Sequence, residues 1–258
     1  MTPTDHLFER IRHESLAEMV VDKIEDMIVR GVLREGNRLP SERELAERLD
    51  VSRPKLREAL KTLEERGLVE TRHGEGSFIA PLSGQAMTPA LIDLFARHGL
   101  AFYDYLEYRR EQEAIAARLA SERATQTDKV VIETQLAALE RAHAQGDEDM
   151  SREADLQLHI AIVNASHNAM LIHMMTSIYD LTRRGVFYNR DFLRCVDETG
   201  NRLLEQHRKI ANTVLAGDAE AAEAAARAHL DFVEVSFRIG EEQARREKYA
   251  AMRQLVAE

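Results

Sequence analysis

The segment from Leu39 to Leu60, LPSERELAERLDVSRPKLREAL, constrains the fold of this chain more than any other. Ser41 is followed three positions later by Glu44, a capping-box pattern that is typical of a helix start. The apolar residues that follow form a buried stripe at helical spacing: Leu45, Ala46 and Leu49. Asp50 and Val51 then provide a tight turn. The pattern predicts a short helix that ends in a turn.

A second helix is predicted directly after this turn. Ser52 can cap it, and Pro54 falls in its first turn, where the missing N–H group is not needed. Its first two turns carry three cations: Arg53, Lys55 and Arg57. A helix-turn-helix motif inserts the start of its second helix into the major groove of DNA, so cations are expected there. The segment therefore predicts a DNA-binding helix-turn-helix.

Residues 68–80, LVETRHGEGSFIA, contain two short β-prone runs around a Gly-x-Gly centre, a pattern typical of a hairpin. Arg72, His73 and Gly74 are expected at its tip, where a small cationic loop can enter a minor groove. An ordinary helical hairpin with a β-turn and solvated charges is the alternative. The order of the three features favours a winged helix.

These residues resemble the GntR family of bacterial transcription regulators over about the first eighty positions. The resemblance lies in PSERELA from Pro40, VSRxxLREAL from Val51 and the RHGxGSFI hairpin from Arg72. It implies that Arg43 contacts DNA and that His73 and Gly74 contact DNA from the wing. It also implies DNA contacts from the second helix at Ser52, Arg53, Lys55 and Arg57. The planar forks of Arg53 and Arg57 suit bases, whereas Ser52 and Lys55 suit phosphates. Pro54 stands where many members of this family have a small polar residue, so no base contact is expected from this position.

The charge balance is acidic, with a net charge of −10 for the chain. Residues 1–82 hold 14 Lys and Arg against 17 Asp and Glu, so the positive charge is local rather than general. We expect the acids of the first motif helix to face away from DNA: Glu42, Glu44, Glu47 and Asp50. This balance predicts weak non-specific DNA binding and a steep dependence on the correct site.

The length of 258 residues suffices for two domains, and the single cysteine, Cys195, excludes a disulfide framework within the chain and fits a reducing cytoplasm. No apolar run approaches a membrane span, and the first residues do not resemble a signal peptide. The stretch APLSGQAMTP, residues 80–89, marks a domain boundary. We predict a winged-helix domain at 1–80, a linker at 81–89, a helical domain at 90–245 and a charged tail at 246–258.

Beyond the linker the sequence is helical in pattern, so the predicted fold is mainly α, with an antiparallel helical bundle after the winged helix. The predicted helices are 89–97, 101–123, 128–144, 149–164, 168–187, 191–216 and 219–252. Within 128–144, the expected amphipathic face consists of Val130, Val131, Leu136, Ala137, Leu139 and Glu140.

The histidines carry the chemistry of this second domain. Asp155 and His159 are four residues apart, so their side chains leave one face of a helix. His207 and His229 each lie in an otherwise apolar helical pattern that turns them inward. Three imidazoles and a carboxylate suit a borderline divalent ion, although each histidine alone is more often a core or surface residue. Spacing alone leaves both interpretations open.

This region resembles the FCD domain, the ligand-sensing helical domain of the FadR subfamily of GntR regulators, over roughly residues 90–240. The resemblance lies in LExRxxxE from Leu106, DxxxH from Asp155, and the separate His207 and His229. It implies one metal ion on Asp155, His159, His207 and His229. Zinc fits these ligands best, with nickel or manganese as alternatives.

Arg109 occupies the arginine position of the same pattern. It can clamp an effector carboxylate, or it can form a structural salt bridge to Glu113 or Glu107. The resemblance, including the EExxRREK tail from Glu241, favours regulators of pyruvate, lactate or glycolate use. A small 2-oxo or 2-hydroxy acid is therefore the expected effector.

Three classes of function fit these residues. The favoured one is a cytoplasmic, ligand-responsive transcription regulator, a repressor rather than an enzyme, that binds a palindromic operator as a homodimer. A metal-dependent hydrolase fused to a DNA-binding domain is the second, but the sequence contains no His-Glu-x-x-His. The third is an architectural DNA-binding protein whose second domain only dimerises.

Overall fold

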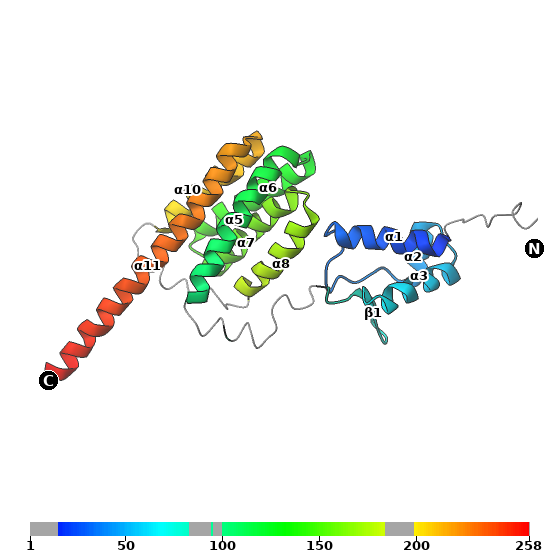
Figure 1. The fold of residues 1–258 in the computed structure, drawn as a ribbon, viewed down its shortest axis with the longest axis horizontal. Helices are drawn as coiled ribbons and strands as arrows, with labels where there is room; N and C mark the ends of the chain where they lie inside the picture. Colours follow the sequence, from blue (N-terminus) through cyan, green and yellow to red (C-terminus); the bar gives the residue numbers. More distant parts are fainter. Residues whose placement is uncertain (1–14, 83–93, 95–99, 184–198, 258) are drawn as a thin grey trace, which may run out of the picture. The chain divides into compact units, whose positions relative to one another are not determined.

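The computed structural model describes residues 15–82, 94, 100–183 and 199–257. The chain divides into two compact units, residues 1–84 and 85–258 (Figure 1). The predicted helix at 89–97, apart from Leu94, and the start of the one at 191–216 lie outside the described residues, as does Cys195.

The first unit is a winged helix, as the sequence predicts. Its elements are α1 (Leu16–Val29), α2 (Glu42–Leu49), α3 (Arg53–Glu65), β1 (Val69–Arg72) and β2 (Gly76–Ile79). Helix α1 is not among the helices that we predicted, although Ser15 and Glu18 form a complete capping box at its start. Its inner face packs with α3 and the hairpin in one apolar core that includes Ile24, Leu63 and Ile79.

The turn between α2 and α3 depends on a left-handed backbone at Asp50, where φ is 52°. At the start of α2, the Ser41 hydroxyl accepts a hydrogen bond from the Glu44 N–H, as expected. Ser52 does occupy the N-cap of α3, but its hydroxyl makes no capping hydrogen bond. The expected role of Ser52 as a side-chain cap is therefore wrong, and its exposed hydroxyl is left to face solvent.

The hairpin wing pairs β1 with β2 in antiparallel register, from Val69 opposite Ile79 to Arg72 opposite Gly76. Its turn consists of residues 73–75, and Gly74 there has a φ of 78°, which favours glycine. Arg72 is the last residue of β1, and its guanidinium lies 4.4 Å above the Phe78 ring. The wing tip therefore presents His73 and Gly74.

The second unit is a bundle of helices. They are α5 (Leu100–Arg123), α6 (Gln126–Gln145), α7 (Glu148–Ala165), α8 (Ala169–Arg183), α10 (Thr199–Ala216) and α11 (Ala219–Ala257). Helix α5 packs against α11 and α7, and α10 packs against α11 and α6. The first part of α11 lies within the bundle, whereas its last turns run on past the other helices (Figure 1). Along the described residues, no helix has the length and apolar character that crossing a membrane requires.

The buried face of α6 differs from the predicted one. Val130 and Val131 are exposed, whereas Ile132, Leu139 and Ala142 are buried. Adjacent residues are about 100° apart on a helix, so Val130, Val131 and Ile132 cannot share one narrow face. The bundle selects the face of Ile132, seven residues before Leu139.

Candidate metal site and DNA-binding surface

The predicted DNA-contacting side chains gather around the start of α3. Arg53 and Arg57 are exposed, and Lys55 is half-buried. Lys55 Nζ lies 2.8 Å from Glu58 Oε2, and Arg57 Nε donates a hydrogen bond of 2.7 Å to Glu42 Oε2. Glu42, which we expect to face away from DNA, thus pairs with a predicted DNA-contacting residue, because the first turn of α2 lies beside α3.

The remaining predicted contacts are also solvent-accessible. Arg43 lies in the first turn of α2, Ser52 precedes α3, and His73 and Gly74 form the wing tip; all four are exposed. The winged-helix unit thus presents every predicted DNA-contacting residue to solvent.

In the helical unit, three histidines from three helices converge. His159 on α7, His207 on α10 and His229 on α11 are each buried, and their ring nitrogens lie within 4.8 Å of one another. The two Nε2 atoms of His159 and His207 are 3.2 Å apart. Asp155, one turn before His159, places Oδ1 2.9 Å from His207 Nε2. The three histidines are therefore brought together, and Asp155 lies beside one of them.

In His159 and His229, the Nδ1 atom contacts a side-chain oxygen from outside the histidine cluster. His159 Nδ1 lies 2.8 Å from Glu113 Oε2 on α5, and His229 Nδ1 lies 3.0 Å from Gln206 Oε1 on α10. A carboxylate or amide oxygen at one ring nitrogen fixes the tautomer and the ring orientation, as is usual for metal-bound histidines. The opposite nitrogen of each ring is thereby turned toward the other histidines.

The electrostatics of the cluster differ between two of its rings. Burial, together with the neighbouring His207 and His159, holds the pKa of His229 well below its usual value, so the neutral ring keeps one nitrogen lone pair available. Burial also opposes charge on His159, but the Glu113 carboxylate outweighs it and raises the pKa of His159. The pocket therefore favours positive charge beside Glu113.

The donor set fits a divalent ion. Two nitrogens bound to one ion at about 2.1 Å lie about 3.0–3.4 Å apart, which matches the distance of 3.2 Å between the two Nε2 atoms. Asp155 and the three histidines would hold such an ion, which would act there as a Lewis acid toward an oxygen ligand.

Arg109 lies on α5 next to this cluster, and it is buried. Its Nε donates a hydrogen bond of 2.7 Å to Glu113 Oε1, while its guanidinium lies 5.5 Å from the centre of the Tyr179 ring. The structural salt bridge to Glu113 is thus present, and Glu107, the other expected partner, is exposed. Burial opposes charge on Glu113, yet Arg109 and His159 lower the pKa of Glu113 far below its usual range.

A small cavity opens between Glu113, His159 and Tyr179, with room for about one water. The Tyr179 hydroxyl on α8 is buried, and it makes no hydrogen bond of normal geometry in the described part of the chain. Burial, together with the nearby Glu113 carboxylate, raises the pKa of Tyr179. A buried hydroxyl without a partner is costly, so this atom is suited to an oxygen ligand. Tyr179 was not among the predicted site residues, because it is one of many apolar-face residues of α8 and has no distinctive spacing.

Family models match both units. The model for bacterial regulatory proteins of the GntR family matches residues 16–79, and the FCD domain model matches residues 104–232. An Escherichia coli K12 protein named as a regulator of the L-lactate dehydrogenase operon is 36% identical over 235 residues, which cover 89% of this chain and 90% of that protein. The chain belongs to the GntR family, with an FCD domain.

Other GntR-family proteins show the same relationship. The Glc operon transcriptional activator of Escherichia coli K12 is 37% identical, covering 83% of this chain and 86% of the activator. The regulator LutR of Bacillus subtilis is 34% identical, covering 81% of this chain and 94% of LutR. A solved GntR structure from Streptococcus agalactiae aligns with a TM-score of 0.52 at 25% identity, covering 85% of this chain and 99% of that one. This GntR-family chain is a DNA-binding transcription regulator.

Proposed function

We propose that this regulator senses a small carboxylate, a 2-oxo or 2-hydroxy acid, at a divalent metal ion held by Asp155, His159, His207 and His229. The observation that carries the proposal is the convergence of three buried histidines within 4.8 Å, beside an unpartnered tyrosine hydroxyl. The names of the relatives, which concern the L-lactate dehydrogenase and Glc operons, agree with an acid of this size. The ion would complete its coordination with oxygens of the acid.

Effector binding would change the shape of the helical domain. The cavity beside Tyr179 has room for about one water, so an acid of several heavy atoms needs a wider pocket. A ligand that binds only a widened conformation shifts the population toward it. The site draws on α5, α7, α8, α10 and α11, so widening it moves helices of the whole bundle. We propose that a homodimer transmits this movement to its winged helices and so represses from a palindromic operator.

Tyr179→Phe tests the effector pocket. The variant removes a buried hydroxyl that has no partner, so without effector its stability should be unchanged or higher, by up to about 1 kcal/mol. The rise in melting temperature that lactate, glycolate or pyruvate produces in the metal-loaded protein should shrink. Thermal shift with each acid, before and after chelation, measures both effects. A full shift in Tyr179→Phe would exclude its hydroxyl from the pocket, and the absence of any shift with all three acids would refute the proposed effector class.

Arg57→Ala tests the DNA-binding surface. We expect operator affinity to fall by about 1–3 kcal/mol, because Arg57 would lose a base contact in the major groove. Binding to random DNA should change much less. Fluorescence anisotropy with both DNAs at two salt concentrations measures this, and Arg48→Ala is the matched control, since Arg48 pairs with Glu44 within α2. An equal loss on both DNAs would assign Arg57 to phosphate instead.

A further inference from the structure

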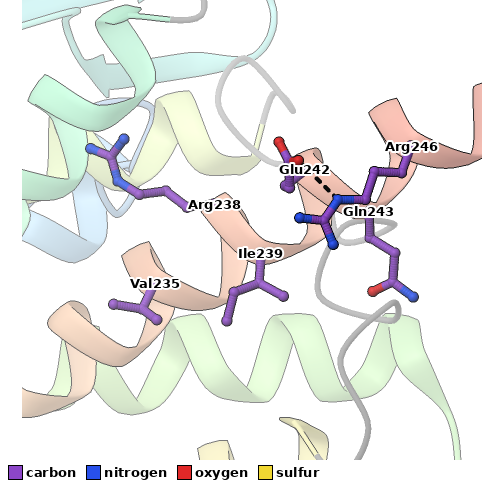
Figure 2. Close-up of a pocket in the computed structure, with 6 residues that line it drawn as sticks. All are labelled: Val235, Arg238, Ile239, Glu242, Gln243 and Arg246. Atoms are coloured by element: carbon purple, nitrogen blue, oxygen red, sulfur yellow. Dashed lines mark hydrogen bonds and ion pairs between the residues drawn. The ribbon is translucent and has the colours of Figure 1, made fainter. Parts of the chain in front are cut away.

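Many ion pairs in the described part of the chain link neighbouring turns of a single helix. Figure 2 shows one of them, between Glu242 and Arg246 of α11, whose Oε1 and Nε atoms are 2.9 Å apart. The pair between Arg57 and Glu42 is different, because its partners are 15 residues apart and lie on α3 and α2. It therefore links the two helices of the helix-turn-helix motif.

The other cations at the start of α3 are not held in this way. Lys55 pairs with Glu58, one turn further along the same helix. Arg53 is exposed, and its side chain has no ion-pair partner among the described residues. Within that part of the chain, Arg57 is thus the cation at the start of α3 that a second helix holds.

Glu42 is itself held in place by the fold. It is the first residue of α2, which begins at the Ser41 cap, and a carboxylate in the first turn of a helix interacts favourably with the helix dipole. Leu45 of α2 and Leu56 of α3 are buried in the same apolar core, so the two helices keep one relative orientation. The Glu42 carboxylate therefore approaches Arg57 from a fixed direction.

The ion pair leaves the terminal nitrogens of Arg57 available for DNA. Arg57 donates its Nε–H to Glu42 Oε2 over 2.7 Å, and its side chain is 67% exposed. A guanidinium has further N–H groups on both terminal nitrogens, and these suffice for a bidentate contact with guanine. Holding the Nε–H fixes the plane of the guanidinium before DNA arrives, so less side-chain freedom is lost on binding.

We propose that Glu42 is a positioning residue for base recognition, which orients Arg57 toward one base of the operator without contacting that base itself. The proposal rests on the base contact expected from Arg57, and it is independent of the metal site and of the effector. Exposed ion pairs contribute little to folding stability, so the fold should tolerate the replacement of Glu42.

Selection from random DNA tests this role. Full-length wild type, Arg57→Ala, Glu42→Ala and the double variant each bind a library of random duplexes, and sequencing of the bound DNA gives the base preference at every position. Arg57→Ala should remove the preference at one position of each half-site. Glu42→Ala should lower the preference at that same position by about 2- to 12-fold, the cost of immobilising one long side chain, and leave the other positions unchanged. The double variant should match Arg57→Ala.

Glu44→Ala is the matched control, because Glu44 is about as exposed as Glu42 and pairs with Arg48 within α2. It should keep the full base preference at every position. Glu42→Gln keeps an acceptor oxygen without the charge, so its preference should lie between those of the wild type and Glu42→Ala. Full preference in Glu42→Ala would refute the positioning role, and so would an equal loss at every position. If Arg57→Ala removed no preference, the base contact and this proposal would fail together.

Discussion

Replacing Arg109 with methionine is expected to lower the free energy of unfolding by about 3–5 kcal/mol. Arg109 and Glu113 form a buried ion pair at 2.7 Å, and methionine would fill the space while leaving the Glu113 carboxylate buried without its cation. Chemical denaturation followed by circular dichroism measures the loss. The double variant Arg109→Met/Glu113→Leu should recover most of it, because no charge then remains buried.

Arg118→Met on the same helix is the matched control. Arg118 is about as exposed as its partner Glu122, 3.4 Å away, so we expect a change of at most about 1 kcal/mol. An Arg109→Met variant as stable as Arg118→Met would mean that the Arg109 pair contributes little. Because Arg109 supports the fold, its loss disturbs any effector response indirectly, and Tyr179→Phe is the cleaner probe of the pocket.

His207→Ala is expected to abolish metal binding, with a loss of affinity of at least about 100-fold. Even partners that only orient metal ligands contribute about 10–100-fold, and His207 is itself a proposed ligand in contact with both His159 and Asp155. In the wild type, an ion at 100 to 1,000 times its Kd should stabilise the fold by about 2.7–4.1 kcal/mol. The variant should lose this gain.

The measurement compares each protein with and without metal, so any loss of packing in His207→Ala cancels. Metal content by mass spectrometry and the melting temperature after chelation provide the two readings. His143→Ala is the control, because His143 hydrogen-bonds Asn201 away from the cluster. Equal metal content in wild type and His207→Ala would remove His207 from the ligand set and require another explanation for the three converging histidines.

Much of the fold follows from local signals in the sequence. The Ser41 cap, the glycines of the wing and the capping box at Thr125 each fix a helix end or a turn through a few adjacent atoms. The buried face of α6 cannot be predicted from local signals, because this helix has apolar residues on several sides. Its packing against neighbouring helices decides which side is buried, here the side of Ile132 and Leu139. Helix α1 carries the same kind of local signal, a capping box at Ser15.

The sequence likewise indicates some residues of the candidate site and not others. The spacing of Asp155 and His159 and the apolar surroundings of His207 and His229 marked these side chains as candidates, whereas the full set was implied only by the resemblance to the FCD domain. The partners that orient them were not predicted: Glu113 was considered only as an ion-pair partner of Arg109, and Gln206 contacts His229 rather than its neighbour His207. Such contacts depend on how α5 and α10 rotate in the bundle, which no local pattern encodes.

The three histidines come from α7, α10 and α11, segments far apart along the chain. An ion bound to all three would tie these segments together, and the unfolded chain offers no such preformed site. The abundance of the regulator in a cell would then depend on metal supply, because proteases degrade a protein in proportion to the fraction of its chains that is transiently unfolded. Metal starvation would shorten the lifetime of the protein and so change the expression of its target genes without any change in effector concentration.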